Sequence, residues 1–215
     1  MNEKIERTMK MLEQNYMKPY YCENRAEALE LLKTLIPKGA AVSHGGSVTL
    51  KEIGAPELLS NGDYKYLDRS KCKTPEETQA LYRECFSADV FLTSSNAVTE
   101  NGELYNVDGN ANRISCIAFG PKSVVAVVGV NKIVKDLDEA AYRIKTIAAP
   151  KNTVRLGLDT YCAKAGKCVS LTTECPEMSD GCHSPDRICC SYLVSGQQRV
   201  KDRIKVIIVN EELGY

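Results

Sequence analysis

The sequence predicts an α/β protein in which a mixed or largely parallel sheet is flanked by helices. Segments with apolar residues at helical spacing alternate with short apolar runs, which is the order that parallel sheets with helical crossovers produce. The 215 residues are 43% hydrophobic and 26% charged, as expected for a globular chain with one sizeable core. We therefore expect a single domain over residues 1–215.

Helices and strands are expected to alternate through the first half of the chain. Apolar residues at helical spacing predict an N-terminal helix over residues 3–16, within residues 1–20. Asn24 is expected to cap a second helix that stops at Pro37. The elements expected next are a strand at Gly39–Ser43, a helix at Thr49–Leu59, a strand at Tyr64–Leu67, a helix from Pro75 to Phe86 and a strand at Ala88–Thr93.

The second half contains a predicted hairpin and a cysteine-rich segment. Asn101-Gly102 separates two short runs and predicts a type I′ turn, because both central residues of that turn need positive φ. The remaining expected elements are strands at Ile114–Phe119, Val124–Val128 and Ile204–Val209, and a helix from Asp136 to Ala149 that ends at Pro150. Residues 150–192 form the cysteine-rich segment, which has no clear periodicity until about Ile188.

Charge and hydropathy argue against two classes of partner. The chain has 28 basic and 28 acidic residues and a formal net charge of zero, so we expect binding neither to nucleic acid nor to an anionic membrane. The longest apolar run, Ser123–Val130, is too short to cross a bilayer. The N-terminus lacks the apolar stretch of a secretory signal. We therefore expect a cytoplasmic protein.

A glycine-containing loop at Ser43–Leu50 is the first candidate binding site. A predicted strand runs into Gly45-Gly46, and a predicted helix follows directly. Glycines let the backbone approach a ligand, and the free N–H groups of a helix N-terminus favour an anion. The hydroxyls of Ser47 and Thr49 could add hydrogen bonds. The alternative interpretation is a tight strand–helix turn in which Ser47 is only the N-cap.

Four further residues could act on a ligand near this loop. Glu100 and Asp108 are candidate general bases, and Arg113 could bind a carboxylate or phosphate through two hydrogen bonds. Lys132 follows the Val124–Val128 strand and could point into the same crevice. The alternatives are turn chemistry for the first three residues and an ordinary solvated lysine for the fourth.

Six of the ten cysteines lie between Cys162 and Cys190. In a cytosolic protein such a density favours a zinc ion or an iron–sulfur cluster over disulfides, although free thiols also remain possible. His183 could replace one thiolate. Cys189 and Cys190 are not expected to bind one ion together, because adjacent side chains diverge. The cysteines of this segment are Cys162, Cys168, Cys175, Cys182, Cys189 and Cys190.

Taken together, these segments resemble the LUD-domain family, which is named for lactate utilization, and most closely its short members. The resembling segments cover nearly the whole chain: Ser43–Leu50, Thr99–Leu104, Asn106–Arg113, Phe119–Pro121, Val128–Lys132, Ala148–Asn152, the cysteine segment and Val209–Gly214. The resemblance implies a fold like that of ribose-5-phosphate isomerase and the CoA transferases, in which the first glycine loop commonly binds an anionic group. It makes Ser43, Gly45, Gly46, Ser47 and Thr49 ligand-binding candidates, with Glu100, Asp108, Arg113 and Lys132 lining the same crevice.

The resemblance also separates the cysteines into two groups. Cys162 and Cys168 match the first pair of the family's cysteine run, and Cys182 and Cys189 match the last pair. Residues 169–181 are an insertion relative to that run. The implied ligands of a zinc ion or iron–sulfur cluster are therefore Cys162, Cys168, Cys182 and Cys189.

The resemblance implies a role in oxidising L-lactate to pyruvate together with an iron–sulfur partner protein. Three hypotheses remain open on the sequence. The chain could be an accessory component of lactate utilization, a stand-alone enzyme for a phosphorylated or carboxylated metabolite, or a binding module whose metal is purely structural.

Overall fold

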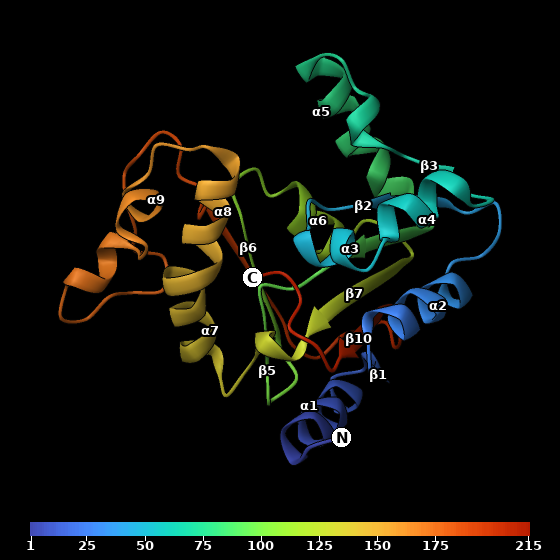
Figure 1. Ribbon diagram of the computed structural model, residues 1–215, viewed down its shortest axis with the longest axis horizontal. Coiled ribbons are helices and arrows are strands. Elements are labelled where there is room, and N and C mark those ends of the chain that lie inside the picture. Colours follow the sequence, from blue (N-terminus) through green and yellow to red (C-terminus); the bar gives the residue numbers. More distant parts are fainter.

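The computed structural model describes residues 1–215 and contains two sheets with helices on their outer faces (Figure 1). All six strands of the larger sheet are parallel. Their spatial order is β1 (Lys18–Cys22), β10 (Ile204–Val209), β7 (Ser123–Gly129), β4 (Val90–Thr93), β2 (Ala41–His44) and β3 (Lys65–Tyr66). The smaller sheet is mixed, in the order β8 (Ile133–Val134), β5 (Ala97–Thr99), β6 (Leu104–Asp108) and β9 (Ser191–Ser195). The predicted α/β class is confirmed.

Side-chain caps begin most of the longer helices, where they accept hydrogen bonds from otherwise unpaired backbone N–H groups. Asn24 and Thr74 cap α2 and α5, as the sequence predicts. None of the helices is both long and apolar enough to cross a membrane. The helices are α1 (Glu3–Gln14), α2 (Arg25–Leu35), α3 (Val48–Glu52), α4 (Ala55–Asn61), α5 (Pro75–Glu84), α6 (Asn112–Ala118), α7 (Leu137–Arg143), α8 (Ala149–Leu156) and α9 (Tyr161–Ala165).

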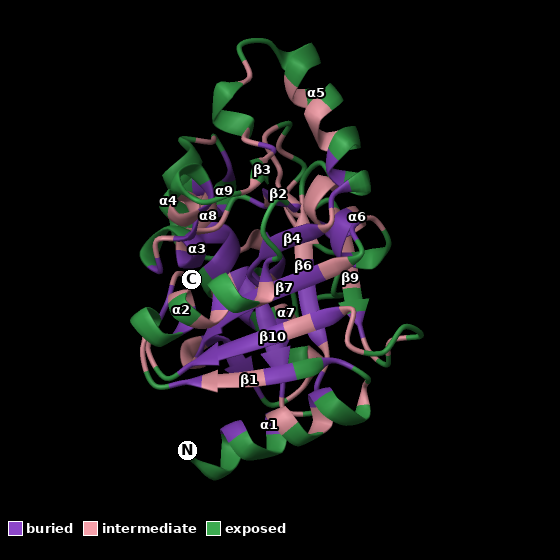
Figure 2. Cartoon of the chain, turned by 90° about the vertical axis from the view of Figure 1, so that its right-hand side faces the viewer, coloured by how far each residue is buried: buried purple, intermediate pink, exposed green.

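The large sheet is buried on both faces, which explains why its central strands are continuous apolar runs. Helices α2, α3 and α4 cover one face, against alternate residues of β7 and β10 such as Val127 and Ile207. Helices α1 and α6 and the small sheet cover the other face, against Val128 and Ile208. The outer face of the small sheet packs against α7 and α8. Figure 2 shows the resulting band of buried residues along β10, β7 and β4.

The predicted strand at Ile114–Phe119 is wrong, because Asn112–Ala118 forms α6. The carboxylate of Asp108 accepts hydrogen bonds from the backbone N–H groups of Arg113 and Ile114 and so starts a helix. The buried positions Ile114 and Ile117 have helical spacing. A six-residue apolar run does not by itself distinguish a strand from a buried helical segment.

Three helix boundaries also differ from the prediction. The N-terminal helix ends at Gln14, and strand β1 follows from Lys18. The predicted helix at Thr49–Leu59 is two helices, because Gly54 adopts positive φ between them. The helix from Leu137 continues past Pro150 to Leu156, through a π-helical turn at Ile144–Ala148. Pro150 lies in the first turn of α8, directly after that π-helical turn.

The hairpin at β5 and β6 is confirmed, but its turn differs from type I′. Only Gly102 has positive φ, and Thr99 and Glu103 close a three-residue loop through a backbone hydrogen bond of 2.9 Å. A three-residue loop of this kind needs glycine at one position only. Strand β9 and helix α9, within the cysteine-rich segment, and strands β1 and β8 lie outside the sequence prediction.

Candidate functional site

The carboxyl ends of β2, β4 and β7 lie side by side at one edge of the large sheet. The loops that follow these strands, together with α8 and the residues after β6, enclose a cleft of about 370 Å³. In open α/β sheets ligands commonly bind outside the carboxyl ends of the strands. The polar residues that line the cleft include Ser47, Arg69, Ser94, Ser95, Asn96, Asp108, Arg113, Lys132, Asn152, Arg155 and Tyr215.

Lys132 is the most unusual residue of this cleft. It lies in the turn after β7 and is only 3% exposed, yet it borders the cleft. Its Nζ atom donates hydrogen bonds to Thr49 Oγ1 at 2.8 Å and to Ser94 Oγ at 3.0 Å. No carboxylate forms an ion pair with it. The cleft therefore contains a buried amine whose hydrogen-bond partners are both neutral hydroxyls.

The environment of Lys132 destabilises its charged form. Burial lowers the pKa of Lys132 to about 7, and the positive charges of Arg143 and Arg113 contribute to the decrease. Both of these arginines lie close by, and Arg143 is itself buried and donates only to backbone carbonyls. Near neutral pH the amine can therefore either carry a charge that attracts an anion or accept a proton from a ligand.

Asp108 and Arg113 form an ion pair of 2.7 Å on the cleft wall. Arg113 is 12% exposed, and its five guanidinium N–H groups donate to Asp108, to the side chains of Asn96 and Asn106, and to two backbone carbonyls. Asp108 also accepts two backbone N–H groups at the start of α6. Arg113 thus contributes positive potential but no free donor. The oxygens of Asp108 are engaged, which argues against its predicted role as a general base.

The glycine loop borders the cleft only in part. Gly46 and Ser47 line the cleft, and Ser47 caps α3 by accepting from the N–H of Leu50 at 3.2 Å. Gly45 lies against Arg113, whose Cδ would be 2.8 Å from a Cβ atom at this position. The loop is therefore both part of the cleft wall and a surface on which Arg113 packs. Helix α3 has only five residues, so its N-terminus is a weaker anion site than the sequence suggests.

Three predicted site residues lie elsewhere. Ser43 is buried below the loop and donates to the carbonyl of Leu67. Thr49 is buried and touches the site only by accepting the hydrogen bond from Lys132. Glu100 lies in the hairpin loop and pairs with Arg7 of α1 at 3.8 Å, outside the residues that line the cleft. The expectation that Glu100 shares the crevice is therefore wrong, because the hairpin packs toward α1.

Several cleft residues were missed by the sequence reasoning. Ser94, Ser95 and Asn96 follow the predicted strand Ala88–Thr93, so the run of polar residues at a strand's carboxyl end was an available signal. Arg155 and Asn152 reach the cleft because the helix continues beyond Pro150. Asn152 is the last residue of the resembling segment Ala148–Asn152, whereas no sequence signal pointed to Arg155.

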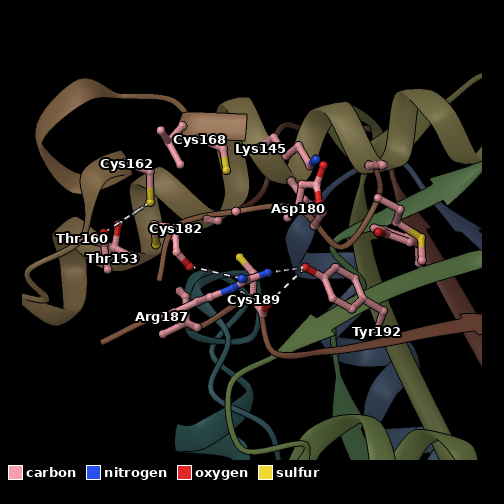
Figure 3. Close-up of a pocket in the computed structure, with 18 residues that line it drawn as sticks. Lys145, Thr153, Thr160, Cys162, Cys168, Asp180, Cys182, Arg187, Cys189 and Tyr192 are labelled. Carbon is pink, nitrogen blue, oxygen red and sulfur yellow. Dashed lines mark hydrogen bonds between the residues drawn. The ribbon is translucent and has the colours of Figure 1, made fainter. Parts of the chain in front are cut away.

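A second, smaller cavity of about 30 Å³ lies beside the cleft and is lined by Cys162, Cys168, Cys182 and Cys189 (Figure 3). These are the four cysteines that the resemblance selects. Cys175, Cys190 and His183 do not line it, and Cys175 and Cys190 are exposed. All ten cysteines are free thiols in the structure. No three potential metal-binding side chains stand close enough to share an ion as they are placed.

The cysteines reach this cavity from different turns of the chain. Thr160 caps α9, and the hydroxyls of Thr153 and Thr160 contact Cys162 Sγ at 3.6 and 3.3 Å. The guanidinium of Arg187 donates to the carbonyls of Cys182 and Cys189 at 3.1 and 2.9 Å. Burial raises the pKa of the Cys189 thiol to about 12, and the neighbouring Cys162, Cys168 and Cys182 contribute to the increase.

Comparisons with known proteins place the chain in a family. The sequence model of the LUD domain matches residues 5–209. The chain belongs to the LUD domain family. A crystal structure of a DUF162 family protein from Deinococcus radiodurans has 15% sequence identity to this LUD-domain chain, covers 96% of each chain and superposes with a TM-score of 0.55. The two chains therefore share a fold.

A second solved structure gives a more distant match. Ribose 5 phosphate isomerase A from Neisseria gonorrhoeae has 16% identity, a TM-score of 0.34, and coverage of 53% of this chain and 54% of the isomerase chain. Among curated proteins, no sequence matches this chain significantly.

Proposed function

We propose that this LUD-domain protein binds a small carboxylated or phosphorylated metabolite in the cleft and acts as an accessory component of lactate utilization. The observation that carries the proposal is the buried amine of Lys132, which lacks a carboxylate partner inside the protein. A buried cation without a counter-ion is costly. An anionic ligand would supply the missing charge.

The charge of the whole cleft agrees with an anionic ligand. Four basic side chains line it, Arg69, Arg113, Lys132 and Arg155, against the single carboxylate of Asp108. Arg69 donates to Tyr82, and Arg155 donates to Asn152 and Tyr215. Neither is in an ion pair. Because these neighbours are neutral, both guanidinium groups keep their charge available to a ligand.

The hydroxyls beside Lys132 suit a hydroxy or oxo acid. Ser94 Oγ and Thr49 Oγ1 both accept from Lys132 Nζ, and Ser94 lines the cleft. A carboxylate could bind to the ammonium group while a neighbouring hydroxyl or carbonyl of the ligand contacts Ser94 or Asn96. The cleft volume of about 370 Å³ is within the usual range for small-molecule sites.

The lactate role draws on the family and on the ligand chemistry together. Oxidation of L-lactate to pyruvate releases two electrons and two protons, and an iron–sulfur partner protein would accept the electrons. The LUD-domain chain would bind the hydroxy acid or a related anion, with Lys132 holding its carboxylate. A cytoplasmic location fits such a partnership and belongs to the proposal.

A stand-alone enzyme is the second candidate, and the pKa of Lys132 favours it. An amine with a pKa of about 7 can accept and return protons at neutral pH. In this alternative Lys132 would take a proton from an anionic metabolite, in place of the sequence candidates Glu100 and Asp108. Glu100 lies outside the cleft and the oxygens of Asp108 are engaged.

Calorimetric titration with L-lactate, pyruvate, sugar phosphates and CoA tests the binding proposal. We expect at least one of these anions to bind and Lys132→Met to weaken that binding by about tenfold or more. Exposed Lys201→Met is the matched control and should bind like the wild type. The proposal fails if none of the anions binds, or if both variants bind equally well.

Partner capture tests the accessory role separately. The untagged partner should co-purify from the native host under anaerobic conditions and carry iron and acid-labile sulfide. If the anion binds, no partner is found and the purified chain alone converts the anion, the stand-alone enzyme is the correct alternative.

A further inference from the structure

The hydrogen bonds around Lys132 leave the lone pair of its neutral amine free. Nζ donates to Thr49 Oγ1 at 2.8 Å and to Ser94 Oγ at 3.0 Å. Each hydroxyl uses its own proton elsewhere. Thr49 donates to the carbonyl of Leu213 at 3.2 Å, and Ser94 donates to the carbonyl of Ser95 at 3.4 Å. Neither hydroxyl therefore donates to Nζ, so both N–H groups of the neutral amine are engaged while its lone pair has no donor in the protein.

The surroundings of the amine favour this neutral, nucleophilic form. The charged groups that act on it are Arg143 of α7, Arg113 of α6 and Glu52 of α3. Burial and the two guanidinium groups together outweigh Glu52, and the pKa of Lys132 is lowered to about 7. Burial beside a second cation is one of the ways in which proteins activate a lysine as a nucleophile. At pH 7 about half of the amine is neutral, against roughly one part in three thousand for an exposed lysine.

The cleft also offers a carboxylate site on the same part of its wall. Arg155 donates through Nε and Nη2 to Asn152 and Tyr215, and its Nη1 has no partner in the protein. Tyr215 directly follows Gly214, where a Cβ atom would lie 3.3 Å from Lys132 Nζ. Arg155, Tyr215 and Lys132 all line the cleft. A ligand with an anionic group next to a carbonyl carbon would therefore find a partner for each.

We propose that Lys132 forms a covalent imine with a 2-oxo acid in the cleft. The inference rests on the proposed function, since the same cleft must admit a carboxylated metabolite, but it gives Lys132 a second role. A 2-hydroxy acid has no electrophilic carbon and can only pair with the charged amine. A 2-oxo acid also presents a carbonyl carbon to the neutral amine, while Arg155 holds its carboxylate. Lys132 would thus distinguish oxo acids from hydroxy acids.

The reaction needs neither an oxidant nor a reductant. The lone pair of Nζ attacks the carbonyl carbon, so that a C–N bond forms and the former carbonyl oxygen takes up a proton from the nitrogen. The C–O bond of this carbinolamine then breaks, and the oxygen leaves as water with both protons that the amine gives up. Ser94 lines the cleft and accepts a hydrogen bond from Nζ, so its hydroxyl can pass a proton from nitrogen to oxygen.

Ionic and covalent binding respond to pH in opposite ways. Pairing with a carboxylate needs the charged amine, so it weakens above pH 7. Attack on a carbonyl carbon needs the neutral amine, whose fraction rises about 50-fold between pH 5 and pH 7. We therefore expect L-lactate to bind best at acidic pH, whereas covalent capture of pyruvate should increase as pH rises to 7.

Reductive trapping on the full chain tests the inference. The protein is incubated at pH 7 with pyruvate and cyanoborohydride, which reduces an imine to a stable secondary amine, and the modified residue is then mapped by mass spectrometry. We expect roughly one adduct per chain, on Lys132, formed about a hundredfold faster than on any exposed lysine of the same sample. The exposed lysines are internal controls, so the wild-type protein alone can decide the result.

A second carbonyl compound and three variants make the test specific. Acetone, in which a methyl group replaces the carboxylate of pyruvate, should label Lys132 about tenfold more slowly or less, because it has no group for Arg155 to bind. Arg155→Met should slow labelling by pyruvate but not by acetone. Lys132→Met should lose the adduct, whereas exposed Lys201→Met should react like the wild type.

Several results would overturn the imine. One is a wild-type protein in which Lys132 carries no adduct, or gains it no faster than the exposed lysines do. Another is equal labelling by acetone and pyruvate, which would show a reactive amine without an oxo-acid site. Calorimetric binding of L-lactate or pyruvate without an adduct would refute this inference and leave the proposed function intact. An adduct on Lys132 in a protein that captures no iron–sulfur partner would support the inference and count against the accessory role.

Discussion

Replacing Lys132 by methionine should stabilise the protein while it weakens anion binding. Lys132 is buried without a counter-ion, and its pKa is lowered from 10.5 to about 7. Below pH 7 the side chain is protonated in both the folded and unfolded states, so folding carries the full cost of burying the charge. As pH rises above 7 the folded protein loses the proton while the unfolded chain keeps it, and this cost decreases.

The size of the effect follows from the two pKa values. One pKa unit corresponds to about 1.4 kcal/mol, so wild-type stability relative to Lys132→Met should rise by about 3 kcal/mol between pH 6 and pH 9. Above pH 10.5, where the unfolded chain also loses its proton, the difference should become constant. Methionine has a similar length and keeps the apolar packing.

Urea denaturation of both proteins at several pH values measures this difference. The contributions of all other titrating groups cancel in the comparison, and exposed Lys201→Met should show no comparable pH dependence relative to wild type. A stability difference between wild type and Lys132→Met that does not change from pH 6 to pH 9 would refute the reasoning, because Lys132 would then titrate alike in the folded and unfolded chains.

Two other predictions concern the cleft and its wall. First, a bound anion should raise the pKa of Lys132 above its value of about 7 in the free protein, so the affinity for the anion should fall by up to about tenfold per pH unit above pH 7. Calorimetry in buffers of different ionisation enthalpy should detect the proton that the protein takes up on binding. An affinity that does not change with pH would contradict this prediction. Second, Gly45→Ala should lower the free energy of unfolding by about 1–3 kcal/mol, because a Cβ atom at this position would lie 2.8 Å from Arg113 Cδ. Gly46→Ala is the control in the same urea measurement, because its Cβ atom would meet no atom closer than 3.4 Å.

Much of the fold follows from local patterns in the sequence. The apolar runs at Val124–Val128 and Ile204–Val209 are central strands because only a sheet covered on both faces needs such continuous hydrophobicity. Asn24 and Thr74 start helices through hydrogen bonds within one turn. Where the local signal is short, the prediction fails. The Ile114–Phe119 run is helical, and the carboxylate of Asp108, which precedes it, accepts hydrogen bonds from the backbone N–H groups of Arg113 and Ile114 in the first turn.

The two cavities depend on contacts between distant parts of the chain. Lys132 looks like an ordinary lysine in the sequence, and it becomes a buried amine because Thr49 and Ser94, 83 and 38 residues away, surround its Nζ atom. Likewise, the cysteine spacing suggests a shared site but not its surroundings. Lys145, Arg187 and Tyr105 reach the thiols from a π-helical turn, a loop and strand β6.

The sequence by itself therefore determined the α/β class, the central strands, most helix starts and the membership of the thiol quartet, the last through its resemblance to a family. Helix caps, turns and the spacing of apolar residues depend on interactions within a few residues, so they can be recognised from the local sequence. Only the tertiary structure decided that Asp108 is engaged with Arg113, that Glu100 faces α1, and that Lys132 has no counter-ion. Burial and charge compensation are properties of the packed chain, because they depend on which distant groups exclude water from a side chain.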